Sequence, residues 1–229
     1  MPYPLQVSVA QCELSENHVI LRLKLPHGTP EFAAGHTLQI SLAGESHTLV
    51  LLRIKPNWVE GIMLRSSVWQ DLPPTVEILA CQGANLQVQR TLPLLVGDGI
   101  GGASLIALAE SFKNQAAFQP LVLLSAESLP FAPRPSQIYL KGMPAGVIAA
   151  IPLLEDWKIA SRLASTEDAV GCFEGSVIEL AAHWLAQLQA ETLQHVEIIA
   201  AGKPEFLSEL AQLATQYALP FQGVEQIII

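Results

Sequence analysis

The sequence has few charged residues and few aromatic ones, and its charges are not clustered. Charged side chains make up 14% and aromatic side chains 6% of the 229 residues, whereas about a quarter of an average soluble protein is charged. The formal net charge is -9, and the 12 lysines and arginines form no basic run. Binding of nucleic acid needs clustered cations or exposed aromatic platforms, so no nucleic-acid partner is expected. The low charge content predicts a covered face, against a cofactor, a partner subunit or a second copy in a homodimer.

Cysteine is also scarce, and long apolar runs are missing. Cys12, Cys81 and Cys172 are too far apart for a C-x-x-C metal or iron-sulfur pattern, and their odd number argues against a disulfide framework. We expect no metal site, no iron-sulfur cluster and three thiols buried as small apolar side chains. The first residues lack the basic and apolar regions of a signal peptide, and no apolar run has the length of a membrane span. The expectation is a cytoplasmic protein without membrane insertion.

A glycine cluster between an apolar run and a helical pattern is the most informative stretch. Gly97, Gly99 and Gly102 fit G-x-G-x-x-G after an apolar run that begins at Leu92. Glycine accepts positive φ and lets a phosphate approach the N–H groups of a helix N-terminus. With Gly101, the cluster therefore predicts a pyrophosphate site at a strand-turn-helix junction. The alternative is a glycine turn that only allows a helix to pack closely on a strand.

Before this cluster, apolar and polar residues alternate in short runs that proline and glycine turns separate. The runs are 19–25, 36–42, 47–54, 59–64 and 76–79. No segment of helical period precedes Leu92. Residues 1–90 are therefore predicted to form an antiparallel β-barrel, with a sandwich as the alternative.

After the cluster, predicted strands and helices alternate. The strands are 120–124, 158–164, 196–200 and 224–229, and the helices are 147–157, 176–189 and 204–217. Ser176 with Glu179 has the pattern of a capping box, and Pro204 suits a first helical turn. Such alternation predicts a doubly wound parallel sheet over residues 91–229, which is a nucleotide-binding architecture.

Three further places carry candidate ligand-binding residues. Glu127 follows the second strand of the α/β part, where a dinucleotide fold places the carboxylate that binds the ribose 2′-hydroxyl; this favours NAD over NADP. Asp168 lies on a loop after another strand, and Gly202 and Glu205 flank a strand-to-helix turn. The alternatives are a solvated carboxylate at Glu127 and a plain capped turn at Gly202. No Ser-His-Asp or Cys-His set can be assembled, so no catalytic residue is predicted.

A β-barrel followed by a nucleotide-binding α/β domain resembles the ferredoxin reductase superfamily, and most closely the electron-transfer subunit of dihydroorotate dehydrogenase. Residues 94–109 are similar to the glycine loop of that family, 174–177 to its Gly-x-Val helix start and 201–205 to its Cys-Gly-Pro-Glu turn. The resemblance implies FAD on the barrel and NAD(H) on the second domain. It also implies a partner oxidoreductase subunit or another protein that accepts electrons.

Three positions depart from the family motifs. The flavin motif Arg-x-Tyr/Phe-Ser/Thr aligns with residues 47–50, so the resemblance implies flavin contacts at His47 and Thr48 without the motif's arginine and aromatic ring. A cysteine near the nicotinamide is replaced by Ala201 or its neighbour, and the chain ends where a cysteine-rich tail would hold a cluster. Replacement phosphate contacts would come from Arg53, or from Arg65 with Ser66 and Ser67.

Three functions remain open from the sequence. The first is an FAD-dependent NAD(P)H oxidoreductase or electron-transfer subunit that passes electrons from NAD(P)H through flavin to an acceptor. The second is a catalytically lapsed reductase-fold subunit that acts as a binding or regulatory partner, which the three departures favour. The third is a nicotinamide-dependent dehydrogenase, for which no acid-base pair is found.

Overall fold

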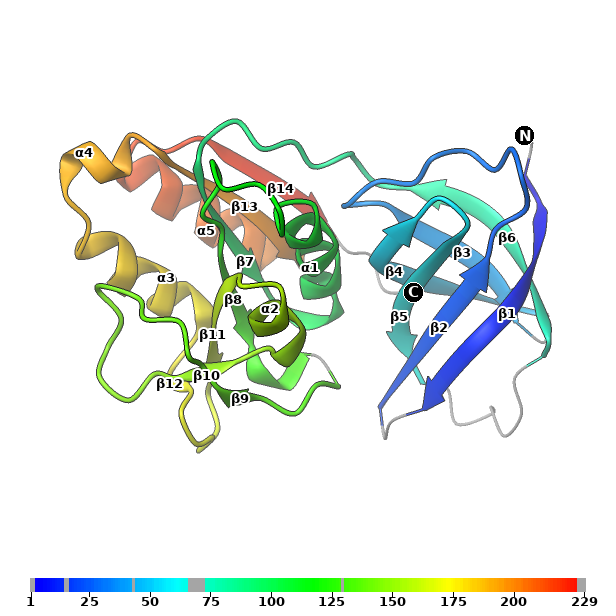
Figure 1. Ribbon diagram of the computed structural model, residues 1–229, viewed down its shortest axis with the longest axis horizontal. Coiled ribbons are helices and arrows are strands. Elements are labelled where there is room, and N and C mark those ends of the chain that lie inside the picture. The colour runs from blue at the N-terminus through cyan, green and yellow to red at the C-terminus, as the bar shows by residue number, and fades with distance from the viewer. Residues whose placement is uncertain (1–2, 15–16, 43, 66–72, 129, 226–229) are drawn as a thin grey trace.

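The protein consists of two lobes joined by one connecting stretch (Figure 1). The computed structural model describes residues 3–14, 17–42, 44–65, 73–128 and 130–225. The six strands before the connecting stretch form the first lobe, and the remaining strands and all described helices form the second. The predicted division near residue 90 falls within this stretch.

The first lobe is a closed antiparallel barrel with the strand order β1-β2-β5-β4-β3-β6. Its strands are β1 (Leu5–Leu14), β2 (His18–Lys24), β3 (Thr37–Leu42), β4 (Glu45–Lys55), β5 (Trp58–Leu64) and β6 (Thr75–Gln82). Residues of alternate positions, such as Leu21 and Leu23 on β2, fill its interior, as the period of two in the sequence predicts. The barrel prediction is confirmed, and each predicted strand is present to within a few residues.

The second lobe is a six-stranded parallel sheet between two layers of helices. Its order is β12-β11-β8-β7-β13-β14, and a two-stranded sheet, β10-β9, lies beside it. The strands are β7 (Leu92–Gly97), β8 (Leu121–Ser125), β9 (Arg134–Pro135), β10 (Ala149–Ala150), β11 (Ala160–Ser165), β12 (Phe173–Glu174), β13 (Val196–Gly202) and β14 (Phe221–Glu225). The helices are η1 (Gly99–Gly101), α1 (Gly102–Glu110), η2 (Ala126–Ser128), α2 (Pro152–Asp156), α3 (Val177–Ala186), α4 (Ala190–Leu193) and α5 (Pro204–Gln216). The predicted doubly wound sheet is confirmed.

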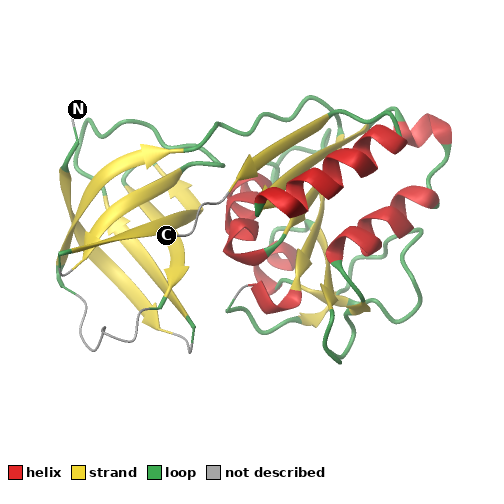
Figure 2. Ribbon diagram, turned by 180° about the vertical axis from the view of Figure 1, so that it is seen from behind, coloured by secondary structure: helices red, strands yellow, loops and turns green. Residues whose placement is uncertain are grey.

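The two faces of this sheet bury different partners. One face, with Leu95 and Val122, packs against α1 and α2, and the other, with Val96 and Leu123, packs against α3 and α5. Figure 2 shows α3 and α5 over the face that points away from α1. The capping box predicted for Ser176 and Glu179 is present at the start of α3.

Three local predictions are wrong. The helix predicted over 147–157 is only α2, because Pro152 takes the first helical position and Ala149–Ala150 pairs with Arg134–Pro135 instead. The closing strand begins at Phe221 rather than at residue 224, and residues 226–229 of the predicted strand lie outside the described ones. Cys12 is exposed rather than buried, because it lies on the outer side of β1.

The lobes share one hydrophobic core. Val50 and Leu52 on β4 belong to the same cluster as Ile106 on α1, and α1 lies against β4 and β5 in Figure 1. The connecting stretch is itself anchored, because the buried carboxylate of Glu197 on β13 accepts the backbone N–H of Gln89 at 2.7 Å. Among the described helices, none has the length and apolar character needed to cross a bilayer.

Candidate functional site

The glycine cluster lies where the strand order of the parallel sheet reverses. The chain runs from β7 outward to β8 and β11, and then returns to the other side of β7 with β13. Open parallel sheets bind ligands beyond the carboxyl ends of their strands at such a reversal. Gly97 ends β7 and Gly202 ends β13, so both predicted glycine sites meet at this carboxyl edge.

The positions of the cluster require glycine for different physical reasons. A Cβ on Gly97 would lie 2.7 Å from Leu124 Cδ2, and one on Gly102 would lie 3.0 Å from the same atom, so both allow close packing of α1 on the sheet. Gly99 has a φ of +61°, and a Cβ there would meet nothing within 4 Å. The position therefore needs a left-handed backbone and faces open space. Close packing alone explains two of these glycines but not the third.

The N-terminus of α1 has no side-chain cap, although Gly101 and Gly102 themselves are buried. Gly101 precedes the helix with no side-chain cap, and the first turn carries no acidic residue. The N–H groups at such a terminus favour an anion. This is the arrangement that the sequence predicts for a pyrophosphate.

A pocket of about 380 Å³, the carboxyl-edge pocket, opens next to Asp98. Most of the charged side chains that line it are negative. Carboxylates from four positions line it, together with a single lysine, Lys203. The carboxylates belong to Asp98, Glu127, Glu205 and Glu209. Two of them are held by serine hydroxyls, because Ser125 Oγ donates to Asp98 at 2.7 Å and Ser165 Oγ donates to Glu127. Such a lining suits a ligand with hydroxyl groups and disfavours additional phosphate groups.

The structure places two of the predicted nucleotide residues in this pocket, and the glycines of the cluster are not among the residues that line it. Glu127, in η2, and Glu205, in the first turn of α5, line the carboxyl-edge pocket. Gly202 is packed against Phe206, whose Cδ1 would lie 2.6 Å from a Cβ, so packing accounts for this glycine. Asp168 lies instead in a neighbouring pocket of about 500 Å³. A nucleotide-binding role for Asp168 stays a prediction, because this residue lies apart from the glycine cluster.

That neighbouring pocket offers no activated nucleophile. Cys172 lines it together with Glu127 and Asp168. Burial, and then the charge of Glu127, raises the pKa of the Cys172 thiol above its ordinary value. The thiol form is therefore favoured, and the arrangement is not that of a reactive cysteine.

The predicted flavin stretch on β4 is covered by protein. Leu49 points into the barrel and Val50, at 0% exposure, packs in the cluster shared with α1. The Thr48 hydroxyl accepts a hydrogen bond from Gln39 Nε2 at 2.8 Å, and His47 Nε2 lies 3.8 Å from Glu45. A flat isoalloxazine ring needs an exposed face, so these residues do not fit it.

The residues expected to replace the phosphate contacts of the motif either bind other groups of the protein or lie outside the described residues. Arg53 donates to Glu110 at 3.3 Å, and its guanidinium lies 5.3 Å from the centre of the Trp58 ring. The Arg65 backbone N–H donates to the Asn17 carbonyl at 2.9 Å. Ser66 and Ser67 lie outside the described residues. The phosphate contacts expected of Arg53, Arg65, Ser66 and Ser67 therefore remain predictions.

Sequence reasoning missed the serine partners of the carboxyl edge. Ser125 and Ser165 end β8 and β11, one residue beyond each predicted strand, and neither was assigned a role. Their position at the carboxyl ends of adjacent parallel strands could have indicated them. Within the described ranges, no group of three or more histidine, cysteine, aspartate or glutamate side chains is arranged to hold a metal ion.

No protein-family profile and no curated protein sequence matches the chain. Solved structures do match its fold. The ferredoxin reductase of carbazole 1,9a-dioxygenase superposes with a TM-score of 0.69 at 14% identity, over 97% of this chain and 69% of that one. An Amycolatopsis cytochrome P450 reductase has a TM-score of 0.68 at 12% identity, over 97% of this chain and 69% of that one.

Ferredoxin-NADP+ reductase from Plasmodium falciparum matches over nearly the full length of both chains, with a TM-score of 0.63 at 10% identity, 96% of this chain and 96% of that one. At such identities the likeness establishes the fold and leaves the activity open. The chain has the two-lobed, ferredoxin reductase-like architecture of a β-barrel followed by a nucleotide-binding-type α/β lobe.

Proposed function

We propose that this chain binds NAD(H) at the carboxyl edge of its parallel sheet and serves as the nucleotide-binding part of an electron-transfer reductase. The observation that carries the proposal is Gly99, whose left-handed backbone faces open space beside the uncapped start of α1. The similarity of the fold to reductases supports it.

Different residues of the carboxyl edge would bind different parts of the nucleotide. The N–H groups at the start of α1 would bind the pyrophosphate, and Glu127 would accept hydrogen bonds from ribose hydroxyls. The four carboxylates of the pocket would repel the additional 2′-phosphate of NADP, so NAD is the nucleotide of choice. When bound, NADH supplies a hydride.

The acceptor of the electrons is assigned to a partner protein. Because the β4 stretch does not fit an isoalloxazine ring, we assign no step to a flavin in this chain. The resemblance to the dihydroorotate dehydrogenase electron-transfer subunit is consistent with action beside a partner oxidoreductase. A cytoplasmic location and a homodimer belong to the same proposal.

Two substitutions at Gly99 test the nucleotide site. Asparagine and aspartate have nearly the same size, and both tolerate the left-handed region better than other residues. Gly99→Asp adds a negative charge beside the expected pyrophosphate and should weaken NADH binding roughly tenfold or more, whereas Gly99→Asn should weaken it about threefold at most. Calorimetric titration of each variant with NADH measures the difference.

The comparison between the two variants isolates charge from shape. Thermal melting of both proteins controls for misfolding. Equal NADH affinities for Gly99→Asp and Gly99→Asn would place the nucleotide elsewhere, and absence of binding to the unchanged protein would remove it altogether.

A second function, that of a lapsed reductase-fold subunit acting through a partner, is favoured by the closed contact between β4 and α1. If Val50 and Leu52 remain covered in solution, the purified protein should be colourless and should retain no FAD after incubation and removal of the excess. The visible absorption spectrum measures this.

The spectrum combines with the NADH titration to separate the two functions. A colourless protein that binds NADH supports the nucleotide-binding module, and a colourless protein that binds no NADH supports the lapsed subunit. A bound-flavin spectrum that bleaches with NADH would contradict the conclusion that the β4 stretch does not fit a flavin. It would instead support an FAD-dependent NAD(P)H oxidoreductase.

A further inference from the structure

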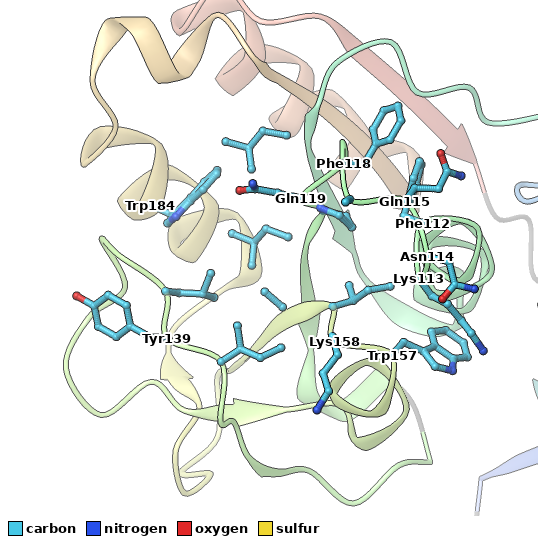
Figure 3. Close-up of a pocket in the computed structure, with 18 residues that line it drawn as sticks. Phe112, Lys113, Asn114, Gln115, Phe118, Gln119, Tyr139, Trp157, Lys158 and Trp184 are labelled. Carbon is cyan, nitrogen blue, oxygen red and sulfur yellow. The ribbon is translucent and has the colours of Figure 1, made fainter.

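A pocket of about 560 Å³, the amino-edge pocket, opens at the amino ends of β7, β8 and β11, at the edge of the sheet opposite the glycine cluster. The floor of the pocket includes the first residues of these strands, Leu92, Leu121 and Ala160. Figure 3 shows Phe118 and Gln119 above this floor, with Trp157 on one side and Trp184 on the other. The volume lies in the range that holds a small organic ligand.

The charge of this pocket is opposite to that of the chain. Lys113 and Lys158 line it, and none of the described residues that line it is an aspartate or glutamate, although the net charge of the protein is -9. The carboxyl-edge pocket has the reverse composition, four carboxylates and one lysine. A pocket lined by one sign of charge raises the local concentration of ions of the other sign.

Two further cations, Arg53 and Lys55, lie near the pocket outside its lining. The Lys113 ammonium and the Arg53 guanidinium each lie 5.9 Å from the centre of the Trp157 ring. Arg53 and Lys55 share one carboxylate, that of Glu110, at 3.3 and 2.8 Å.

Lys158 has an unusual backbone for a lysine. Its φ is +63° at the position just after α2, where its N–H donates to Glu155 and the next N–H, of Ile159, donates to Leu154. Glycine is the usual residue at this position, because a Cβ is unfavourable in the left-handed region. Strained backbone of this kind concentrates at functional sites. A requirement for the ammonium group would explain why a lysine stands there.

Helix ends explain only part of this charge. The carboxyl ends of α1 and α2 both point to the amino edge of the sheet, and lysines are favourable near such ends. Each end contributes at most about half a negative charge, and less for a short helix such as α2. Two full lysine charges exceed that amount.

We propose that the amino-edge pocket binds a small organic anion, a ring compound that carries a sulfonate, phosphate or carboxylate group. The side chains of Lys113 and Lys158 point away from each other in Figure 3, so their ammonium groups would attract the acidic group from two sides of the pocket rather than clamp it. The side-chain amides of Asn114 and Gln119 and the apolar floor would hold the ring. This site is separate from the nucleotide site at the opposite edge.

The probe is 8-anilinonaphthalene-1-sulfonate, and its uncharged counterpart N-phenyl-1-naphthylamine is the matched control. Both become fluorescent in apolar surroundings, and only the first carries an acidic group. Fluorescence titration of the full chain should show saturable binding of the sulfonate at one site. In NMR spectra, the indole signals of Trp157 and Trp184 should move more than that of Trp58.

Substitution of the two lysines tests the role of charge. Lys113→Gln and Lys158→Gly should each raise the dissociation constant of the sulfonate about threefold to fivefold, and the double variant roughly tenfold or more. Lys158→Gly also relieves the backbone, so a loss of binding in that variant cannot come from unfolding. Lys24→Gln, at an exposed position on β2, is the matched control and should leave binding unchanged.

Three results would overturn the proposal. One is an affinity for the sulfonate that neither lysine substitution changes. Another is an equal loss of affinity for the uncharged naphthylamine, which would show that the lysines only shape the pocket. The third is movement of the Trp58 signal alone, which would place the probe elsewhere.

Discussion

Replacement of Arg162 by leucine is expected to lower the free energy of unfolding by about 3–5 kcal/mol. Arg162 lies on β11 at 4% exposure, and its guanidinium holds three carbonyl groups of the surrounding loop and strand. It donates to Val147 at 3.0 Å, to Ser161 at 2.6 Å and to Ile138 at 2.6 Å. Leucine would leave these acceptors without a donor in a buried place.

The substitution would also remove the positive charge near Glu155. Burial lowers the pKa of the Arg162 guanidinium, and the Glu155 carboxylate opposes this shift by favouring the charged form. Glu155, at 5% exposure, accepts the Gln137 N–H at 3.1 Å. Loss of Arg162 therefore destabilises both ends of the loop that joins β9 and β10.

Equilibrium unfolding in urea measures the change, and Arg134→Leu is the matched control. Arg134 pairs with Asp156 at 2.6 Å, but 44% of the Arg134 side chain is exposed. Exposed pairs contribute little, so this variant should change the free energy of unfolding by about 0.5 kcal/mol or less. Equal losses in the two variants would contradict the structural role given to Arg162.

Gly97→Ala is the second large effect, an expected loss of about 2–3 kcal/mol. The added Cβ would lie 2.7 Å from Leu124 Cδ2 and 2.8 Å from Gly102 Cα. The first contact is with a side chain that is itself fully buried, and the second is with the backbone of α1. Neither can move away without shifting the helix from the sheet.

Gly99→Asn is the control for Gly97→Ala within the same loop. Nothing lies within 4 Å of a Cβ at Gly99, so only the cost of the left-handed backbone applies, about 1 kcal/mol. Thermal or urea unfolding of both variants measures the difference. A larger loss for Gly99→Asn than for Gly97→Ala would show that the packing and open positions in the cluster are wrongly assigned.

The sequence predicted the fold well because its periodicities are local and strong. Leu21, Leu23 and Leu25 alternate with Arg22 and Lys24 and do fill the barrel. The capping box of Ser176 and Glu179 also needs only neighbouring residues to form. Where a distant partner decides, as with the pairing of Ala149–Ala150 with Arg134–Pro135, the local pattern predicted a helix that begins too early in the chain.

The candidate sites were less predictable because they depend on side chains from separate elements. The glycine cluster could be read from its spacing, but only the structure separates the packing role of Gly97 from the open position of Gly99. The amino-edge pocket could not be read at all. Lys113 and Lys158 follow different helices, and nothing in their local sequence indicates that they line one cavity.

The most direct test of the nucleotide site is an NMR titration of ¹⁵N-labelled protein with NADH. Binding at the carboxyl edge predicts that the backbone signals of Gly99, Gly101 and Gly102 move in a saturable manner, while those of Lys113 and Lys158 at the opposite edge do not. Movement confined to the two lysines, or no movement at millimolar NADH, would contradict the account.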